Sequence, residues 1–134
     1  MKILKLLTII LLILSTTNCG HCSKNVHLNS VFREVLDILP MNDDNVCSIG
    51  YSNDLGDSVV GTATTTPWIQ CDILIIRGLP PIVEKAVMAH EMLHCLGIEH
   101  SETDFDIMNA YLPPTWYLEK HEAKLYKDLL RYFK

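Results

Sequence analysis

The sequence has no clustered basic residues, no internal repeats and no low-complexity tract or linker. It has 11 lysines and arginines and 16 aspartates and glutamates, which gives a formal net charge of −5. An electrostatic surface for nucleic acid needs a basic patch, so this charge pattern argues against a nucleic-acid partner. At 134 residues without repeats or linkers, the chain is expected to contain one folded domain at most.

The N-terminal segment lacks an apolar run long enough for a comfortable membrane span. Its run from Leu6 to Leu14 is shorter than the roughly 20 residues of a membrane-spanning helix. Two lysines flank the start of this run and small polar residues follow it, which is the order of a secretory signal. We therefore predict a signal peptide over residues 1–20, a single domain over residues 21–134, and a secreted, extracytoplasmic protein.

The end of the signal leaves an alternative open. Leu14-Ser15-Thr16-Thr17-Asn18-Cys19 weakly resembles a bacterial lipoprotein box, although Asn18 is larger than the residue this box prefers. Acylation of Cys19 would then anchor the protein to a membrane. Export in either form permits disulfides. Four cysteines remain, with three ways to pair, and the sequence does not choose among them: Cys22, Cys47, Cys71 and Cys95.

The predicted elements are those of an α+β fold. Helices are predicted where apolar residues recur at three- and four-residue steps: 28–39, a segment opened by Pro80 and Pro81, and 116–132. Strands are predicted where apolar and β-branched residues concentrate: 46–51, 59–66 and 69–76. The first helix is expected to be capped by Asn29 or Ser30 and ended by Pro40. The strand over 69–76 is the most apolar, which favours a central place in the sheet.

One stretch of eleven residues, His90 to His100, carries the pattern of a catalytic zinc site. His90 and His94 are four residues apart, so on a helix they project from the same face. Gly97 can adopt a positive φ that ends the helix and turns the chain back, which lets His100 supply a third nitrogen. Three histidines leave the fourth position of a tetrahedral Zn²⁺ open, as catalytic sites require. Chance placement of these residue types at set positions has a probability on the order of 10⁻⁴.

Glu91 lies beside the first of these histidines and has the chemistry of a general base. Bound zinc lowers the pKa of a coordinated water from about 15.7 toward roughly 7. Glu91 could then take the proton of that water and later deliver it to a leaving amine. The predicted reaction is hydrolysis of an amide bond by a zinc-bound water, without a covalent enzyme intermediate.

The motif and the residues after it resemble the metzincin zinc endopeptidases, in which a methionine turn follows the long zinc motif. Asp106-Ile107-Met108-Asn109 resembles that turn. Ser101, directly after the third histidine, matches the matrixin subfamily, the matrix-metalloproteinase group. Cys71-Asp72-Ile73-Leu74-Ile75 resembles a matrixin strand that pairs in the sheet before the active-site helix. The resemblance spans about residues 61–134 and is specific between His90 and Met108.

This resemblance implies a small, zinc-dependent endopeptidase acting on protein or peptide substrates, and we expect a monomer. It implies a twisted mixed sheet with an active-site helix, a methionine turn and a C-terminal helix. Met108 would form an apolar floor under the imidazoles. Tyr111 stands one residue too far from Met108 to match the tyrosine ligand of some metzincins, so we expect it to be an aromatic wall of the substrate pocket. Neither a cysteine-switch propeptide nor a calcium-binding loop is recognisable.

A second class of function remains open. The same fold could serve as a non-catalytic zinc-containing module that binds a peptide or protein without cutting it. Such a module needs the three ligands but has no use for a general base. The presence of Glu91 therefore favours the enzyme.

Overall fold

The computed structural model describes residues 25–39, 41, 45–46, 48–66, 70–103, 106–111 and 131. The predicted signal peptide, Cys19, Cys22, Cys47 and most of the expected helix over 116–132 lie outside these residues. The described part is a small α+β fold with the element order α2–β1–β2–β3–α3. Within it, no helix combines the length and the apolar character needed to cross a membrane.

The sheet is mixed and three-stranded in the described part of the chain. Its order is β1-β3-β2, so that β3 (Gln70–Ile76) is central between β1 (Ser48–Ser52) and β2 (Gly61–Thr66). β1 runs parallel to β3, with Ser48 opposite Asp72, and β2 runs antiparallel to it, with Gly61 opposite Ile75. The predicted central position of this strand is confirmed.

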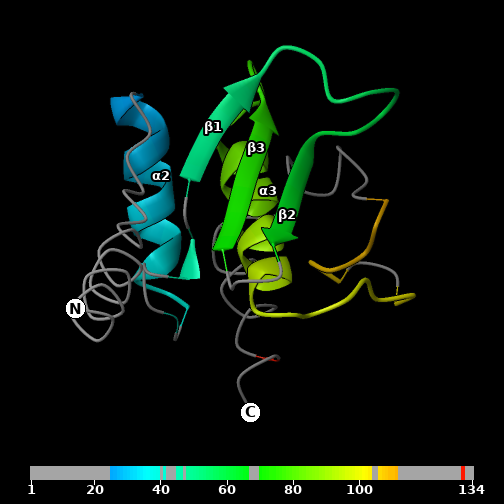
Figure 1. Ribbon diagram of the computed structural model, residues 1–134. Helices are drawn as coiled ribbons and strands as arrows, with labels where there is room; N and C mark the ends of the chain where they lie inside the picture. Colours follow the sequence, from blue (N-terminus) through cyan, green and yellow to red (C-terminus); the bar gives the residue numbers. More distant parts are fainter. Residues whose placement is uncertain are drawn as a thin grey trace, which may run out of the picture.

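Only one face of β3 is buried, although apolar residues of this strand occur on both faces. Cys71, Ile73 and Ile75 alternate toward the helices and are at most 2% exposed. On the other face Leu74 is 41% exposed, and Asp72 accepts a 2.6 Å hydrogen bond from the Ser48 hydroxyl. The two described helices therefore cover the same side of the sheet, as Figure 1 shows, with α3 behind the strands and α2 beside β1.

Strands β1 and β2 both start about two residues later than the sequence pattern predicts. Before β2, the backbone N–H of Val59 donates to Gly56 O at 3.3 Å, which closes a turn, and Ser58 has a φ of 65°. This turn uses backbone that the sequence pattern had placed in a strand. Pairing with β3 begins just after this turn, where Ile76 N donates to Val60 O at 2.9 Å.

Helix α2 (Val26–Leu36) buries the stripe that its apolar spacing predicts: Leu28, Val31, Phe32 and Val35. The predicted caps Asn29 and Ser30 are wrong, because both lie inside the helix. Asn25 is the cap, and its side-chain oxygen accepts from Leu28 N at 3.1 Å. The first turn is exposed, with Val26 84% accessible, so apolar periodicity could not mark where the helix begins. The α-helix also ends before Leu39, which is nevertheless buried in the core.

Helix α3 (Pro81–Cys95) begins, as predicted, at the two prolines, with Pro81 in its first turn. Proline suits this position because its missing N–H would have no partner there. The helix packs against β2, β3 and α2. Its buried apolar residues join those of the sheet and of α2, and Ile107 and Met108 complete the same core.

A buried carboxylate on α3 connects three elements. Glu84 is 4% exposed and accepts a hydrogen bond from the Tyr51 hydroxyl on β1. His27 Nε2 on α2 lies 2.7 Å from the other carboxylate oxygen. Burial and this hydrogen bond raise the pKa of Tyr51 to about 12. The sequence gives no sign of this role for Glu84, because a lone glutamate in a helix is usually solvated.

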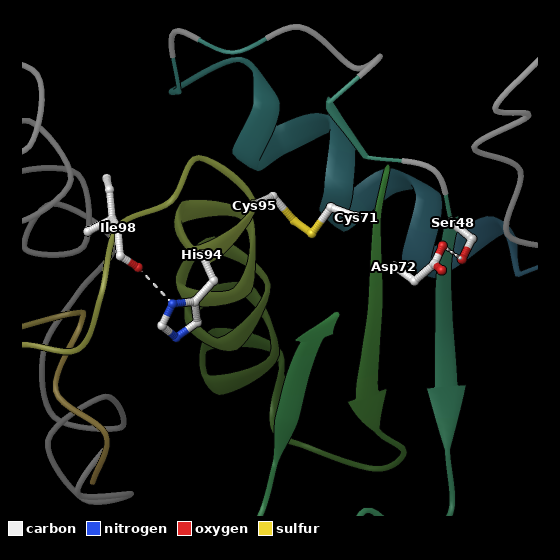
Figure 2. The surroundings of a disulfide bond; sticks show 6 residues. All are labelled: Ser48, Cys71, Asp72, His94, Cys95 and Ile98. Carbon is white, nitrogen blue, oxygen red and sulfur yellow. Dashed lines mark hydrogen bonds between the residues drawn. A yellow bond between two sulfur atoms is a disulfide. The ribbon is translucent and has the colours of Figure 1, made fainter. Parts of the chain in front are cut away.

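A disulfide joins Cys71 of β3 to Cys95, the last residue of α3, with Cα atoms 5.6 Å apart (Figure 2). The sequence had left the pairing open. This bond selects one of the three pairings and leaves Cys22 and Cys47, outside the described residues, as the remaining two of the set. It fixes the C-terminal end of the helix to the central strand.

Candidate metal centre and cleft

The structure brings His90, His94 and His100 together at the end of α3. Their Nε2 atoms form a nearly equilateral triangle: His90 to His94 is 3.1 Å, His94 to His100 is 3.1 Å, and His90 to His100 is 3.3 Å. These three side chains form a group that could hold a metal ion. They come from two positions on the helix and one on the chain that follows it.

Backbone carbonyls determine which ring nitrogens of His90 and His94 are available. His90 Nδ1 lies 2.6 Å from Ile107 O, and His94 Nδ1 lies 2.7 Å from Ile98 O, the second contact being visible in Figure 2. A carbonyl oxygen only accepts, so we assign the proton of each neutral ring to Nδ1. Each Nε2 then presents a lone pair toward the centre of the triangle.

In this assignment the Nε2 lone pairs of His90 and His94 face each other at 3.1 Å and repel unless a cation lies between them. Burial lowers the pKa of His90 to about 4, and the adjacent His94 and His100 rings act in the same direction. Burial also lowers the pKa of His94. Both shifts favour neutral imidazoles, which are the form that binds metals.

The dimensions of the triangle fit a tetrahedral ion with nitrogen ligands. Zinc–nitrogen bonds of about 2.0–2.1 Å in tetrahedral geometry put the nitrogens roughly 3.3 Å apart, close to the observed 3.1–3.3 Å. The donor set, three imidazoles and no thiolate, is common for Zn²⁺. The residues present therefore fit this ion.

The turn after α3 is built by glycine. Gly97 has a φ of 82°, and its N–H donates to His94 O at 2.9 Å while Ile98 N donates to Leu93 O at 3.1 Å. These two bonds form a Schellman motif, which satisfies carbonyls at the helix end. The same turn places Ile98 O against the His94 ring and directs the chain toward His100.

The segment with the methionine pairs with the chain that follows this turn, at Ser101. Asp106 Oδ1 accepts from Met108 N at 2.9 Å, and Met108 O accepts from Ser101 N at 2.8 Å. Ile107 and Met108 are fully buried, which fixes the Ile107 carbonyl that orients His90. The role of Met108 as a floor under the imidazoles stays a prediction.

Glu91 lies next to the histidines and is 5% exposed. Burial raises the pKa of its carboxyl to about 7. Among the described residues, no hydrogen bond or ion pair holds this carboxylate. Packing alone therefore fixes its position.

A cleft of about 710 Å³ runs over the histidines and Glu91. Its lining also includes the start of β2 with the chain before it, residues 58–63, as well as Ala110 and Tyr111. Tyr111 lines this cleft and is 88% exposed; its role as an aromatic wall for a substrate stays a prediction. The cleft thus combines a metal-binding group, a carboxylate and an edge of the sheet.

Sequence reasoning missed three contributors to this site. The carbonyls of Ile98 and Ile107 orient the rings, but a carbonyl belongs to every residue and leaves no mark in the sequence. Gly61 on β2 lies against Glu91, and an isolated glycine within a strand pattern signals a close approach of this kind.

Comparisons with protein-family models, with curated proteins and with solved structures each found no match. The function of the site is therefore argued from its geometry alone.

Proposed function

We propose that this protein is an exported zinc-dependent endopeptidase of the metzincin type, close to the matrixins. The single observation that supports this most strongly is the triangle of three Nε2 atoms, with Glu91 lining the same open cleft. A buried structural site would have no need of a cleft or of an adjacent carboxylate.

His90, His94 and His100 hold the ion in this proposal. When bound, Zn²⁺ polarises a carbonyl and makes a coordinated water acidic near neutral pH. The Glu91 carboxylate would take a proton from the attacking water and give it to the nitrogen of the leaving amine. A carboxyl with a pKa of about 7 in the metal-free site is well matched to both steps, and a nearby cation favours its ionised form.

Strand β2 supplies a way to hold a peptide. In the described part of the chain it pairs with β3 alone, so its other edge offers free backbone N–H and C=O groups. An extended peptide can add to such an edge through backbone hydrogen bonds. Residues 58–63 line the cleft, so a peptide bound there would pass over the histidines.

The Cys71–Cys95 disulfide supports the part of this proposal that concerns export. Stable disulfides form in oxidising compartments and are rare in the cytosol. The Cys71–Cys95 bond therefore agrees with the signal peptide expected over residues 1–20. Secretion and lipid anchoring at Cys19 are equally compatible with it.

The test is a comparison of wild type with Glu91→Gln. Purified wild type should bind one zinc per chain by metal analysis and cleave a mixed peptide library, with loss of cleavage in chelator and recovery on adding zinc. Glu91→Gln should keep the zinc and lose roughly 10²–10⁴-fold in turnover, the usual contribution of a general acid–base. Glu99→Gln, at an exposed position, is the matched control and should keep full turnover. Equal turnover in wild type and Glu91→Gln would refute the role of Glu91.

The alternative is a zinc-containing module that binds peptides without cutting them. Wild type would then take up one zinc and capture peptides but release no products, and Glu91→Gln would behave as wild type. Absence of stoichiometric zinc uptake would contradict both functions.

A further inference from the structure

Gly61 is the first residue of β2 and faces α3. It lies opposite Ile75 in the antiparallel register, and directly opposed residues of antiparallel strands share a face of the sheet. Ile75 is fully buried on the side that the helices cover. Gly61 therefore presents its α-carbon to the part of α3 that carries Glu91.

The space at Gly61 is too small for any side chain. A β-carbon built there would lie 2.6 Å from Val87 Cγ1, 2.7 Å from Glu91 Oε1 and 3.1 Å from Glu91 Cγ. At Gly97, in contrast, a β-carbon would meet no atom within 4 Å. Gly97 is required by its positive φ, whereas Gly61 has no positive φ. The close approach of β2 to Glu91 explains the glycine at position 61.

A side chain at position 61 would clash with both Val87 and Glu91, and of the two only Glu91 can move without disturbing the core. Val87 is 1% exposed and packed in the core, where interiors resist shifts of this size. The Glu91 carboxylate ends a flexible side chain beside an open cleft, and no polar contact among the described residues holds it. Its position depends on the surface that β2 offers at Gly61.

We propose that Gly61 is a positioning residue: its bare α-carbon lets the edge strand pack directly on Glu91 and holds that carboxylate beside the three histidines. The strand that borders the substrate cleft thus also fixes the orientation of the proposed base. The kinetic consequence rests on the proposed peptidase activity, whereas the structural consequence does not.

The first test compares crystal structures of zinc-loaded wild type and Gly61→Ala. In the variant, Glu91 Oε1 should retreat until its contact with the new methyl reaches the ordinary 3.4–4 Å, while the three histidines keep their places and the zinc content is unchanged. Gly50→Ala is the matched control, since Gly50 is a strand glycine on β1 whose β-carbon would meet only Leu74 Cδ2, at 3.2 Å. It should leave Glu91 where it is.

The second test is kinetic. Gly61→Ala should lower kcat by up to roughly 100-fold, the cost of a small misplacement of a catalytic group, with a smaller effect on KM, and Gly50→Ala should lower neither. The Val87→Ala background removes the contact with Val87 Cγ1 but keeps the contacts with Glu91. Adding Gly61→Ala in this background should therefore lower kcat by the same factor as in wild type.

The outcomes separate this inference from the proposed function. An unmoved Glu91 in the Gly61→Ala crystal structure overturns the positioning role, as does a kinetic effect that disappears in the Val87→Ala background. If wild type cleaves no peptide, the proposed activity fails, and the crystal comparison still decides the role of Gly61.

Discussion

Single atoms determine whether the three histidines can act together. Two backbone carbonyls, from Ile98 and Ile107, accept from Nδ1 of His94 and His90 and leave the Nε2 atoms free to face one another. Contacts of this kind fix ring orientation and raise the basicity of a ligand. Gly97 controls one of them, because its positive φ places Ile98 beside His94.

Replacing Gly97 tests this dependence. Alanine at a φ of 82° should destabilise the zinc-free protein by about 1–2 kcal/mol, since non-glycine residues resist the left-handed region. It should also weaken zinc binding. Gly97→Asn should cost less on both counts, because asparagine tolerates this conformation. Urea unfolding and competitive zinc titration measure the two effects. An equal loss in the alanine and asparagine variants would contradict the role assigned to the backbone.

Helix α3 is the element on which the fold and the site depend together. One side of it packs on the sheet and on α2, while His90, Glu91 and His94 line the cleft. Its C-terminal end is attached to β3 through Cys71–Cys95, directly after the ligand His94. A ligand carried on a helix that is fixed in this way loses little freedom on binding the metal.

Removing the disulfide should reveal that contribution. The bond joins residues 24 apart in sequence, for which the chain-entropy estimate is about 3 kcal/mol of stability. Cys71→Ala/Cys95→Ala should therefore unfold at lower urea and bind zinc more weakly than wild type. Reductant should move wild type toward the variant and leave the variant little changed. A variant with wild-type zinc affinity would show that the bond stabilises the fold without ordering the site.

At the scale of the whole molecule, burial of ionisable groups makes stability depend on pH and metal. Burial raises the pKa of Glu91 from its ordinary 4.5 to about 7, so the fold favours the neutral acid. The stabilisation linked to that proton is complete below pH 4.5 and is lost as the pH rises through 7. Ionisation of Glu91 therefore destabilises the metal-free fold at the position where the proposed function needs a carboxylate.

Glu91→Gln should therefore stabilise the metal-free protein in a pH-dependent way. Glutamine stays neutral, so the gain in the free energy of unfolding should reach up to about 3 kcal/mol at pH 8 and less than about 1 kcal/mol at pH 5. Denaturant unfolding in chelator at the two pH values gives the difference in the free energy of unfolding between the variant and wild type. Contributions that both proteins share, such as that of His90, cancel in this difference. Added zinc should reduce the gain, because the cation favours the ionised carboxylate. A gain that is independent of pH would mean that burial does not disfavour the ionised form of Glu91.

Periodicity predicted the elements better than their ends. The apolar spacing of α2 and the composition of β3 depend on burial, which leaves a pattern in the sequence. The cap of α2 was wrong by four or five residues, because its first turn is exposed and carries no apolar signal. The start of β2 was wrong because a turn at Gly56 to Val59 uses that backbone for its own hydrogen bond.

The sequence by itself determined the set of chemical groups: three histidines at helical and turn spacing, a carboxylate beside the first, and a glycine that reverses the chain. Spacing along one helix and one turn is local, so the printed order of residues is enough to predict it. Only the tertiary structure decided the pairing of Cys71 with Cys95, the carbonyls that orient the rings and the contact of Gly61 with Glu91. The disulfide, the contact of Ile107 with His90 and the contact of Gly61 with Glu91 join residues far apart in sequence, so packing creates them. The contact of Ile98 with His94 is local, but it is made by a backbone carbonyl, which every residue has, so residue types alone do not reveal it.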